Sequence, residues 1–214
     1  MKLILIAPSG GGKGSLAELI VKEYSIPNIS TGDIFRKNIK EKTPLGKKAE
    51  AFVEKGAWVP DDITIDMLLD RIKHSDCKSG FILDGFPRTL NQAKALAEKV
   101  DIDVVIEIQI TDKLVLERLS GRFMCKGCDY IWNTRYEGFT ADKCAKCAGE
   151  LWQRDDDKEE VIKKRLNQYR EANKCILDFY KKQGKLFSVQ NKPETMPMDT
   201  FLTVKAYFEK KGLK

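Results

Sequence analysis

Histidine and long apolar runs are the two features that this sequence has least of. The single histidine, His74, falls on an expected helix near Cys77, and we interpret it as a packing or surface residue. No apolar run approaches the roughly 18 residues that a membrane-spanning helix needs, which excludes such a helix. The apolar stretch before Pro8, about five residues, is too short for a secretion signal, so a cytoplasmic location is expected.

Basic residues are also not concentrated in any one segment. The 214 residues carry a net charge of +6, with 38 basic and 32 acidic residues. A balance of this sign suits nucleic acid, but it suits small phosphorylated ligands equally well. Because the positive charges are spread along the chain, nucleic acid is the less favoured partner. Hydrophobic residues make up 42%, which is ordinary for a folded chain of one or two domains.

Short apolar strands alternate with amphipathic helices along most of the chain. Buried-strand patterns occur at 2–6, within 80–88, at 104–110 and near 186–189, and helical spacing fills the segments between them. This alternation predicts an α/β fold in which helices cover both faces of a parallel sheet. The pattern breaks at 122–157, where cysteines, glycines and aromatics replace it, so we expect one core with an inserted small module.

The segment "APSGGGKGS" at 7–15 follows the first strand and opens the first helix. Glycines allow backbone N–H groups to converge on a phosphate, and the helix adds its positive end. Lys13 would neutralise the phosphate charge. Ala7 stands where the strict phosphate-loop pattern has its first glycine, and Gly14 separates Lys13 from Ser15. The alternative is a flexible glycine turn between a strand and a helix.

Four of the six cysteines form two closely spaced pairs, Cys125-x2-Cys128 and Cys144-x2-Cys147. Pairs at this separation are typical of a tetrahedral zinc site, and four thiolates leave no coordination position open for a substrate. A zinc ion here would therefore be structural, holding together a flap without a hydrophobic core of its own. Iron on the same thiolates, and four reduced cysteines without metal, are the alternatives.

The glycine-rich loop resembles the P-loop of the nucleoside monophosphate kinases, particularly the adenylate kinases, in which a glycine also follows the lysine. Other segments resemble motifs of the same family: "STGDIFR" at 30–36, "WVPDD" at 58–62, "DGFPRT" at 84–89, and "ERLSGRF" and "QRDDD" on either side of the cysteines. The likeness extends from Met1 to about Phe187, and it indicates the long-lid type with a zinc-binding lid.

This resemblance implies a P-loop NTPase-type parallel sheet flanked by helices, with an inserted helical AMP-binding segment and a small zinc-ribbon-like lid. The expected core comprises residues 1–29, 60–121 and 159–214, the AMP-binding segment residues 30–59, and the lid residues 122–158. The implied activity is reversible phosphoryl transfer, MgATP + AMP ⇌ 2 ADP, by a monomer that uses Mg²⁺ with ATP. Its partners would be these nucleotides, with neither nucleic acid nor a membrane.

The same resemblance assigns roles to particular residues. The ATP site would consist of Gly10, Gly11, Gly12, Lys13, Gly14, Ser15, Arg118, Arg122, Ile131 and Trp132. The AMP site would consist of Thr31, Arg36, Ala57, Trp58, Val59, Gly85, Phe86, Pro87, Arg88, Gln92, Arg154 and Arg165. The catalytic groups would be Lys13, Arg88, Arg122, Arg154, Arg165, Asp156 and Asp157. Asp84, at the end of a strand, would hold Mg²⁺ through water.

Some of these residues also have a simpler interpretation. Thr89-x-x-Gln92 is a capping box that needs no ligand, and Asp155–Asp157 fit the first turn of the long helix that follows. Taken with its flanking motifs, Gln92 would instead pair its amide with the edge of adenine. Trp58, Phe123 and Trp132 depart from the residues usual in the family, and residues 190–200 match it poorly.

Two other functions remain open. A kinase for UMP, CMP or GMP would share the fold, although Gln92 and the long lid favour AMP. A zinc-ribbon protein that binds nucleic acid would use the cysteine module as its recognition surface. Residues 122–154 hold six basic and four acidic residues, and their net charge of +2 is small for binding a polyanion.

Overall fold

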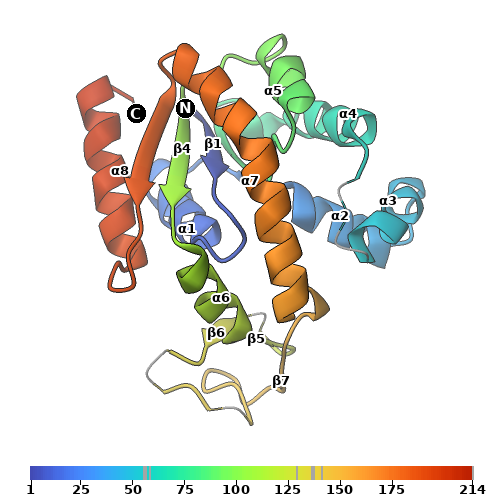
Figure 1. Ribbon diagram of the computed structural model, residues 1–214. Coiled ribbons are helices and arrows are strands. Elements are labelled where there is room, and N and C mark those ends of the chain that lie inside the picture. The colour runs from blue at the N-terminus through green and yellow to red at the C-terminus, as the bar shows by residue number, and fades with distance from the viewer. Residues whose placement is uncertain (55–56, 58, 129, 136–137, 141, 214) are drawn as a thin grey trace.

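A five-stranded parallel sheet forms the centre of the computed structural model, which describes residues 1–54, 57, 59–128, 130–135, 138–140 and 142–213 (Figure 1). The strand order is β2-β3-β1-β4-β8. The strands are β1 (Lys2–Ile6), β2 (Asn28–Ser30), β3 (Phe81–Asp84), β4 (Val104–Gln109) and β8 (Leu186–Gln190). Every neighbouring pair in this sheet runs parallel, which confirms the predicted α/β fold with a P-loop NTPase-type sheet.

Helices connect these strands and flank the sheet. They are α1 (Lys13–Tyr24), α2 (Thr31–Lys40), α3 (Pro44–Glu54), α4 (Asp61–Arg71), α5 (Leu90–Ala97), α6 (Asp112–Ser120), α7 (Glu159–Lys182) and α8 (Pro197–Lys211), with two 3-10 turns, η1 (Ser75–Cys77) and η2 (Asp155–Asp157). Within the described part of the chain, none of the helices combines the length and the apolar character needed to cross a membrane.

The central strand β1 is buried on both faces, because successive side chains of a strand point to opposite sides of the sheet. Leu3 and Leu5 pack in one cluster with residues of α1 and α8. Ile4 and Ile6 pack on the other face with residues of α4, α5 and α7. Helices on both faces of the sheet therefore explain why the four residues of β1 after Lys2 form an unbroken apolar run.

Helices α2 and α3 lie to one side of the sheet, between β2 and α4 in the chain (Figure 1, right). They pack on a small apolar cluster that contains Phe35, Ala49 and Val59. A Cβ on Gly46 of α3 would overlap the backbone carbonyl oxygen of Asn38 at the end of α2. The two helices can approach this closely only because residue 46 has no side chain.

The expected lid, residues 122–158, lies beyond the ends of α6 and α7 (Figure 1, bottom). It contains an antiparallel sheet in the order β6-β5-β7, formed by β5 (Arg122–Cys125), β6 (Ile131–Asn133) and β7 (Leu151–Trp152). Cys125, Trp132 and Cys144 form a buried cluster, with four partly buried apolar residues around them. The expectation that this region lacks an apolar core of its own is therefore wrong.

The three aspartates at 155–157 do not begin the long helix. They form η2, and α7 starts after it, with Lys158 as N-cap and Glu159 and Glu160 in its first turn. The backbone of Lys158 is extended, with ψ of 139°, and this separates the two segments. The simpler interpretation of Asp155–Asp157 as first-turn acids of α7 is therefore wrong.

Candidate active site

The glycine-rich loop turns from β1 into α1 at the carboxyl edge of the sheet. Gly10 and Gly12 have φ angles of 75° and 96°, in the left-handed region that other residues rarely adopt. Gly12 is the N-cap of α1, and Gly14 and Ser15 are exposed in the first turn of that helix. The loop therefore leaves the positive end of a 12-residue helix accessible, as a phosphate site requires.

Lys13 folds back over this loop. Its Nζ donates a hydrogen bond to Ala7 O at 2.6 Å and lies 4.0 Å from Asp84 Oδ1. Burial lowers the pKa of Lys13, and the Asp84 carboxylate partly opposes that shift. Asp84 ends β3 opposite Leu5 of β1 in the sheet register. Parallel pairing of these strands thus brings the lysine and the carboxylate to the same edge of the sheet.

The turn after β3 is joined to the start of α2. Thr31 Oγ1 donates a hydrogen bond to Gly85 O at 3.0 Å, and Arg88 Nε donates to the same oxygen at 2.8 Å. Phe86 and Pro87, between these two residues of the turn, are buried. The core therefore holds the turn in place, and the guanidinium of Arg88 folds back onto the turn's own carbonyl.

Other predicted AMP-site residues lie on or beside α2 and α3. Arg36 forms an ion pair with Asp33, one turn earlier on α2. Val59 is buried in the cluster between α2 and α3, and the Ala57 N–H donates a hydrogen bond back to the end of α3 at 2.8 Å. Trp58 lies outside the described residues.

Gln92 is 2% exposed, and both ends of its amide are hydrogen-bonded. Its Oε1 accepts from the Arg88 N–H at 2.7 Å, and its Nε2 donates to Asp61 Oδ1 at 2.7 Å. The Gln92 backbone N–H is capped by the Thr89 hydroxyl at 3.1 Å. The first half of the predicted capping box is therefore present, but the Gln92 side chain bonds to the Arg88 N–H instead of the Thr89 N–H.

Two arginines form ion pairs with the aspartates of η2. Arg165 of α7 donates to Asp156 Oδ2 at 2.5 Å and to Ser9 Oγ of the glycine-rich loop at 2.6 Å. Arg122 of β5 donates through Nε and Nη2 to the two carboxylate oxygens of Asp157, at 2.8 and 2.6 Å. Arg165 thus links η2 to the glycine-rich loop, and Arg122 links η2 to the lid sheet of which it is part.

Several of these cations also lie close to one another. The pKa of Arg88 is lowered by burial and by the charge of Arg165. The pKa of Arg154 is lowered by burial, and then by Arg122 and Arg36. Neighbouring guanidinium groups repel each other unless an anion lies between them, and their fixed donors match phosphate oxygens. This part of the molecule is therefore suited to bind phosphorylated ligands.

Arg118, Ile131 and Trp132, all predicted to contact ATP, have side chains in different places. Arg118 of α6 faces the glycine-rich loop, since its Nη1 is 3.9 Å from where a Cβ on Gly12 would be. Ile131 is 45% exposed, whereas Trp132 is buried and donates its Nε1–H to Cys144 Sγ at 3.2 Å. The indole of Trp132 thus lies inside the lid, and Ile131 lies on its surface.

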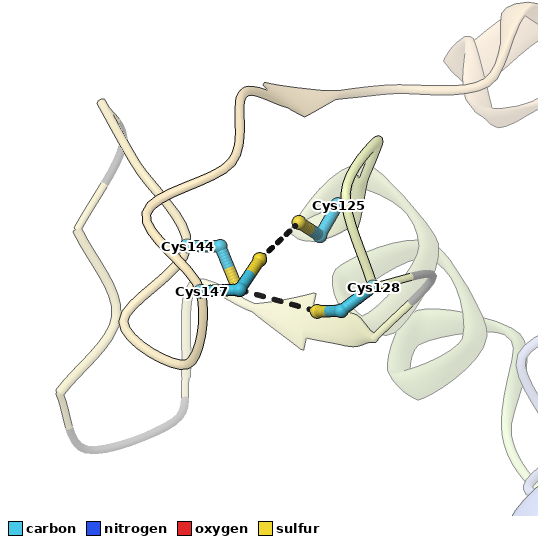
Figure 2. A group of neighbouring side chains, drawn as sticks. All are labelled: Cys125, Cys128, Cys144 and Cys147. Carbon is cyan, nitrogen blue, oxygen red and sulfur yellow. Dashed lines mark hydrogen bonds between the residues drawn. The ribbon is translucent and has the colours of Figure 1, made fainter.

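The four paired cysteines meet in the lid (Figure 2). Their sulfur atoms all lie within 4.8 Å of one another, with Cys125 and Cys147 at 3.3 Å and Cys128 and Cys144 at 3.7 Å. A tetrahedron with Zn–S bonds of about 2.3 Å has sulfur–sulfur edges of about 3.8 Å. The observed separations therefore fit a metal ion bound by four thiolates.

The surroundings of Cys144 favour the thiolate form of its side chain. Burial of Cys144 favours the neutral thiol, but the hydrogen bonds from Trp132 and from the backbone N–H groups of Lys146 and Cys147 outweigh it and lower the pKa to about 6. A thiolate is the metal-binding form of cysteine. Trp132 therefore supports the cysteine group directly.

Some contributing residues escaped prediction from the sequence. Asn191, just after β8, is 7% exposed; its Nδ2 donates to Gly11 O at 3.4 Å, and its Oδ1 accepts from Thr200 Oγ1 at 2.8 Å. Ser9 and Asp61 contact Arg165 and Gln92, as described above. Each acts on a partner distant in the sequence, so no local pattern marks it.

The parallel sheet, the glycine-rich loop with its lysine and the surrounding arginines define a P-loop phosphotransferase that acts on nucleotides. A family model described as adenylate kinase matches residues 5–185. The chain is 47% identical over 192 residues to an adenylate kinase of Caldicellulosiruptor bescii, covering 87% of this chain and 89% of that protein. It is 45% identical over 195 residues to one of Acetivibrio thermocellus (88% and 90%), and 44% identical over 209 residues to one of Agathobacter rectalis (93% and 94%).

The chain therefore belongs to the adenylate kinase family. It is an enzyme that transfers a phosphoryl group between ATP and AMP. The two other functions that the sequence left open, a kinase for a different monophosphate and a nucleic-acid-binding zinc ribbon, are not favoured.

Proposed function

We propose that the chain catalyses MgATP + AMP ⇌ 2 ADP by in-line transfer between two nucleotides held at the carboxyl edge of the central sheet. The observation that carries this proposal is the position of Lys13 Nζ, 4.0 Å from Asp84 Oδ1, in a loop that Arg165 contacts through Ser9. The acceptor is an anionic phosphate oxygen, so the transfer needs no general base. Positioning and charge stabilisation supply the catalysis.

The ATP phosphates would bind to the glycine-rich loop. Backbone N–H groups of 10–15 would donate to phosphate oxygens, and Lys13 would exchange its hydrogen bond to Ala7 O for one to a phosphate. Arg118, facing Gly12, would cover the nucleotide from α6. On the lid, exposed Ile131 would contact the base side of ATP, with Trp132 contributing backbone contacts only.

AMP would bind between the turn after β3 and helices α2 and α3. Arg88 and Arg36 would hold its phosphate, and Thr31 would lie beside its base. Gln92 would pair with the adenine edge. The backbone of residues 57–59 and of the turn at 85–87 would form the remaining wall.

Three arginines would neutralise charge on the transferred phosphoryl group. Arg122 and Arg165 already carry aspartate partners on η2, so Asp157 and Asp156 would align them. The pKa of Arg154 is lowered by burial and then by neighbouring arginines, so the charged form of Arg154 would be stabilised most by the arrival of an anion.

Magnesium bound with ATP would neutralise phosphate charge, and Asp84 would hold its water ligands.

The proposed division of the chain follows these roles. Residues 1–29, 60–121 and 159–214 would form the core, 30–59 the AMP-binding segment and 122–158 the lid. Closure of the last two over the nucleotides would exclude water and so prevent hydrolysis of ATP. A structural zinc ion on the four cysteines would hold the lid together. From the likeness to the family, we infer a monomer.

The test is ADP formation from MgATP with AMP, GMP, UMP and CMP in turn, at the same enzyme concentration. Turnover with AMP alone is expected. Faster turnover with another monophosphate would overturn the assignment of Gln92 to adenine while keeping the mechanism. Absence of turnover with all four would overturn the proposal itself.

A further inference from the structure

We propose that Asp61 is a specificity-determining positioning residue, which fixes the direction of the Gln92 amide and thereby selects an adenine base. The inference rests on the proposed contact between Gln92 and AMP. Asp61 begins α4 and lies where the chain leaves the AMP-binding segment. It links that segment to the residue that would recognise the base.

The hydrogen bonds of Gln92 leave its amide a single orientation. The Arg88 N–H can only donate, so the group facing it must be the oxygen Oε1, at 2.7 Å. The Asp61 carboxylate can only accept, so the group facing it must be Nε2, also at 2.7 Å. A flipped amide would set donor against donor and acceptor against acceptor at once.

This orientation determines what the amide has left to offer a ligand. An amide has two N–H donors and an oxygen with two lone pairs. With one of each in use, Gln92 retains one donor on the Asp61 side and one acceptor on the Arg88 side. Adenine offers a donor at its 6-amino group and an acceptor at N1, and an amide can bind both together. Hypoxanthine and guanine reverse that pair, with an acceptor at O6 and a donor at N1, and would need the flipped amide.

Asp61 is itself held in position from two directions. Its second oxygen, Oδ2, accepts a hydrogen bond from Thr89 Oγ1 at 2.7 Å. Its side chain also lies in the first turn of α4, where an acidic group interacts favourably with the positive end of the helix dipole. Asp62, the next residue in the same turn, is exposed. The chain therefore offers a matched control for the loss of a charge at this helix start.

The decisive measurement is the ratio of kcat/KM for AMP to kcat/KM for IMP, which differs from AMP only in presenting hypoxanthine. In Asp61→Ala, we expect this ratio to fall about tenfold or more, since the flipped amide then loses only its bond to the Arg88 N–H. The KM for ATP stays the same. Asp62→Ala leaves the ratio within about twofold of the unmodified enzyme, as expected for an exposed carboxylate.

Further variants separate orientation from charge and from folding. Asp61→Asn keeps an acceptor oxygen for Gln92 Nε2 and turns its own amide nitrogen to Thr89. We therefore expect Asp61→Asn to keep most of the AMP-to-IMP ratio that Asp61→Ala loses. A purely structural role for Asp61 would reduce both kcat/KM values equally and leave the ratio unchanged. If Asp61→Ala does not fold, Asp61→Glu keeps the charge but displaces the carboxylate by one methylene, and the ratio falls. Where turnover with IMP is too slow, calorimetric affinities for AMP and IMP give the same comparison.

Gln92→Ala, measured in parallel, distinguishes this inference from the proposed function. A fall of the ratio in Gln92→Ala and in Asp61→Ala, with no further fall in the double variant, supports the inference. An unchanged ratio in Asp61→Ala, beside a reduced one in Gln92→Ala, overturns the inference and leaves the adenine contact intact. An unchanged ratio in Gln92→Ala overturns the adenine contact, and the inference with it.

Discussion

Arg122 and Asp157 form a bidentate ion pair between the first strand of the lid and the turn that leads out of it. The two hydrogen bonds measure 2.8 and 2.6 Å, and the Asp157 side chain is 1% exposed. Paired N–H donors on a carboxylate are among the stronger hydrogen bonds in proteins. The entry and exit of the lid are thus fastened to each other.

Removing this buried carboxylate should be costly. Asp157→Ala leaves the Arg122 guanidinium without its partner, and we expect the free energy of unfolding to fall by about 3 kcal/mol. The measurement is urea denaturation, with Arg122→Ala and the double variant completing a cycle. Additive effects of the two single substitutions would contradict a direct interaction.

The lid contains a matched control pair on its surface. Lys126 and Glu150 approach to 2.7 Å, but their side chains are 55% and 67% exposed. Solvent weakens such pairs, so Glu150→Ala should change the free energy of unfolding by no more than about 1 kcal/mol. If Glu150→Ala and Asp157→Ala lowered the free energy of unfolding equally, burial would not be what determines the contribution of each ion pair.

Lys13→Ala should reduce kcat by at least about a hundredfold, because a positioned charge at the transferring phosphate is lost. The Lys13 side chain is 16% exposed, and Lys13 begins α1 directly after a loop whose shape comes from glycines, so the fold should persist. A coupled ADP assay measures the loss, and circular dichroism measures the fold. Lys22→Ala, an exposed change on the same helix, should leave kcat unaltered. Retained turnover in Lys13→Ala would refute the assignment of the loop.

Cys125→Ser should release bound zinc and lower the melting temperature before it affects chemistry. Cys125 is fully buried among the lid residues, and three thiolates hold zinc less well than four. Elemental analysis and thermal unfolding make the two measurements. Cys175→Ser, at an exposed cysteine of α7, should change neither. Removal of zinc by a chelator with no loss of stability would refute a structural metal.

Asn191→Ala and Thr200→Val should each raise the KM for ATP, by up to about tenfold, and leave the KM for AMP unchanged. The Asn191 amide contacts Gly11 of the glycine-rich loop, and Thr200 orients that amide. A net contribution of about 1 kcal/mol per hydrogen bond sets the magnitude. Thr203→Val removes an exposed hydroxyl from the same helix and should alter neither KM. An equal rise in both KM values would indicate general destabilisation instead.

The sequence was sufficient to predict the parts of the molecule that depend on local pattern. Glycines before Lys13 predict a turn into a helix, and two C-x-x-C pairs predict a cluster of four cysteines. Both are present, since backbone freedom and ligand spacing are properties of a few adjacent residues. The parallel sheet followed from apolar strands that alternate with helices.

What escaped prediction depends on residues that meet only in the folded chain. Asp61 and Asn191 receive their roles from Gln92 and Gly11, and sequence spacing carries no information about those pairs. The sequence likewise gives no sign that the indole of Trp132 donates a hydrogen bond to Cys144 inside the lid. Asp155–Asp157 have the composition of a helix start, but they form a separate turn, in which Asp156 pairs with Arg165 and Asp157 with Arg122.

The register of the central sheet also determines how far apart the two proposed nucleotide sites lie. Asp84 of β3 is level with Leu5 of β1 on one side and with Ser30 of β2 on the other. Three chain segments therefore leave the sheet from a single row: the glycine-rich loop, the turn that carries Arg88, and α2. A slip of one residue would move one segment by about 3.3 Å and turn its side chains to the opposite face. The same backbone hydrogen bonds that assemble the core thus also fix the points at which these three segments leave the sheet.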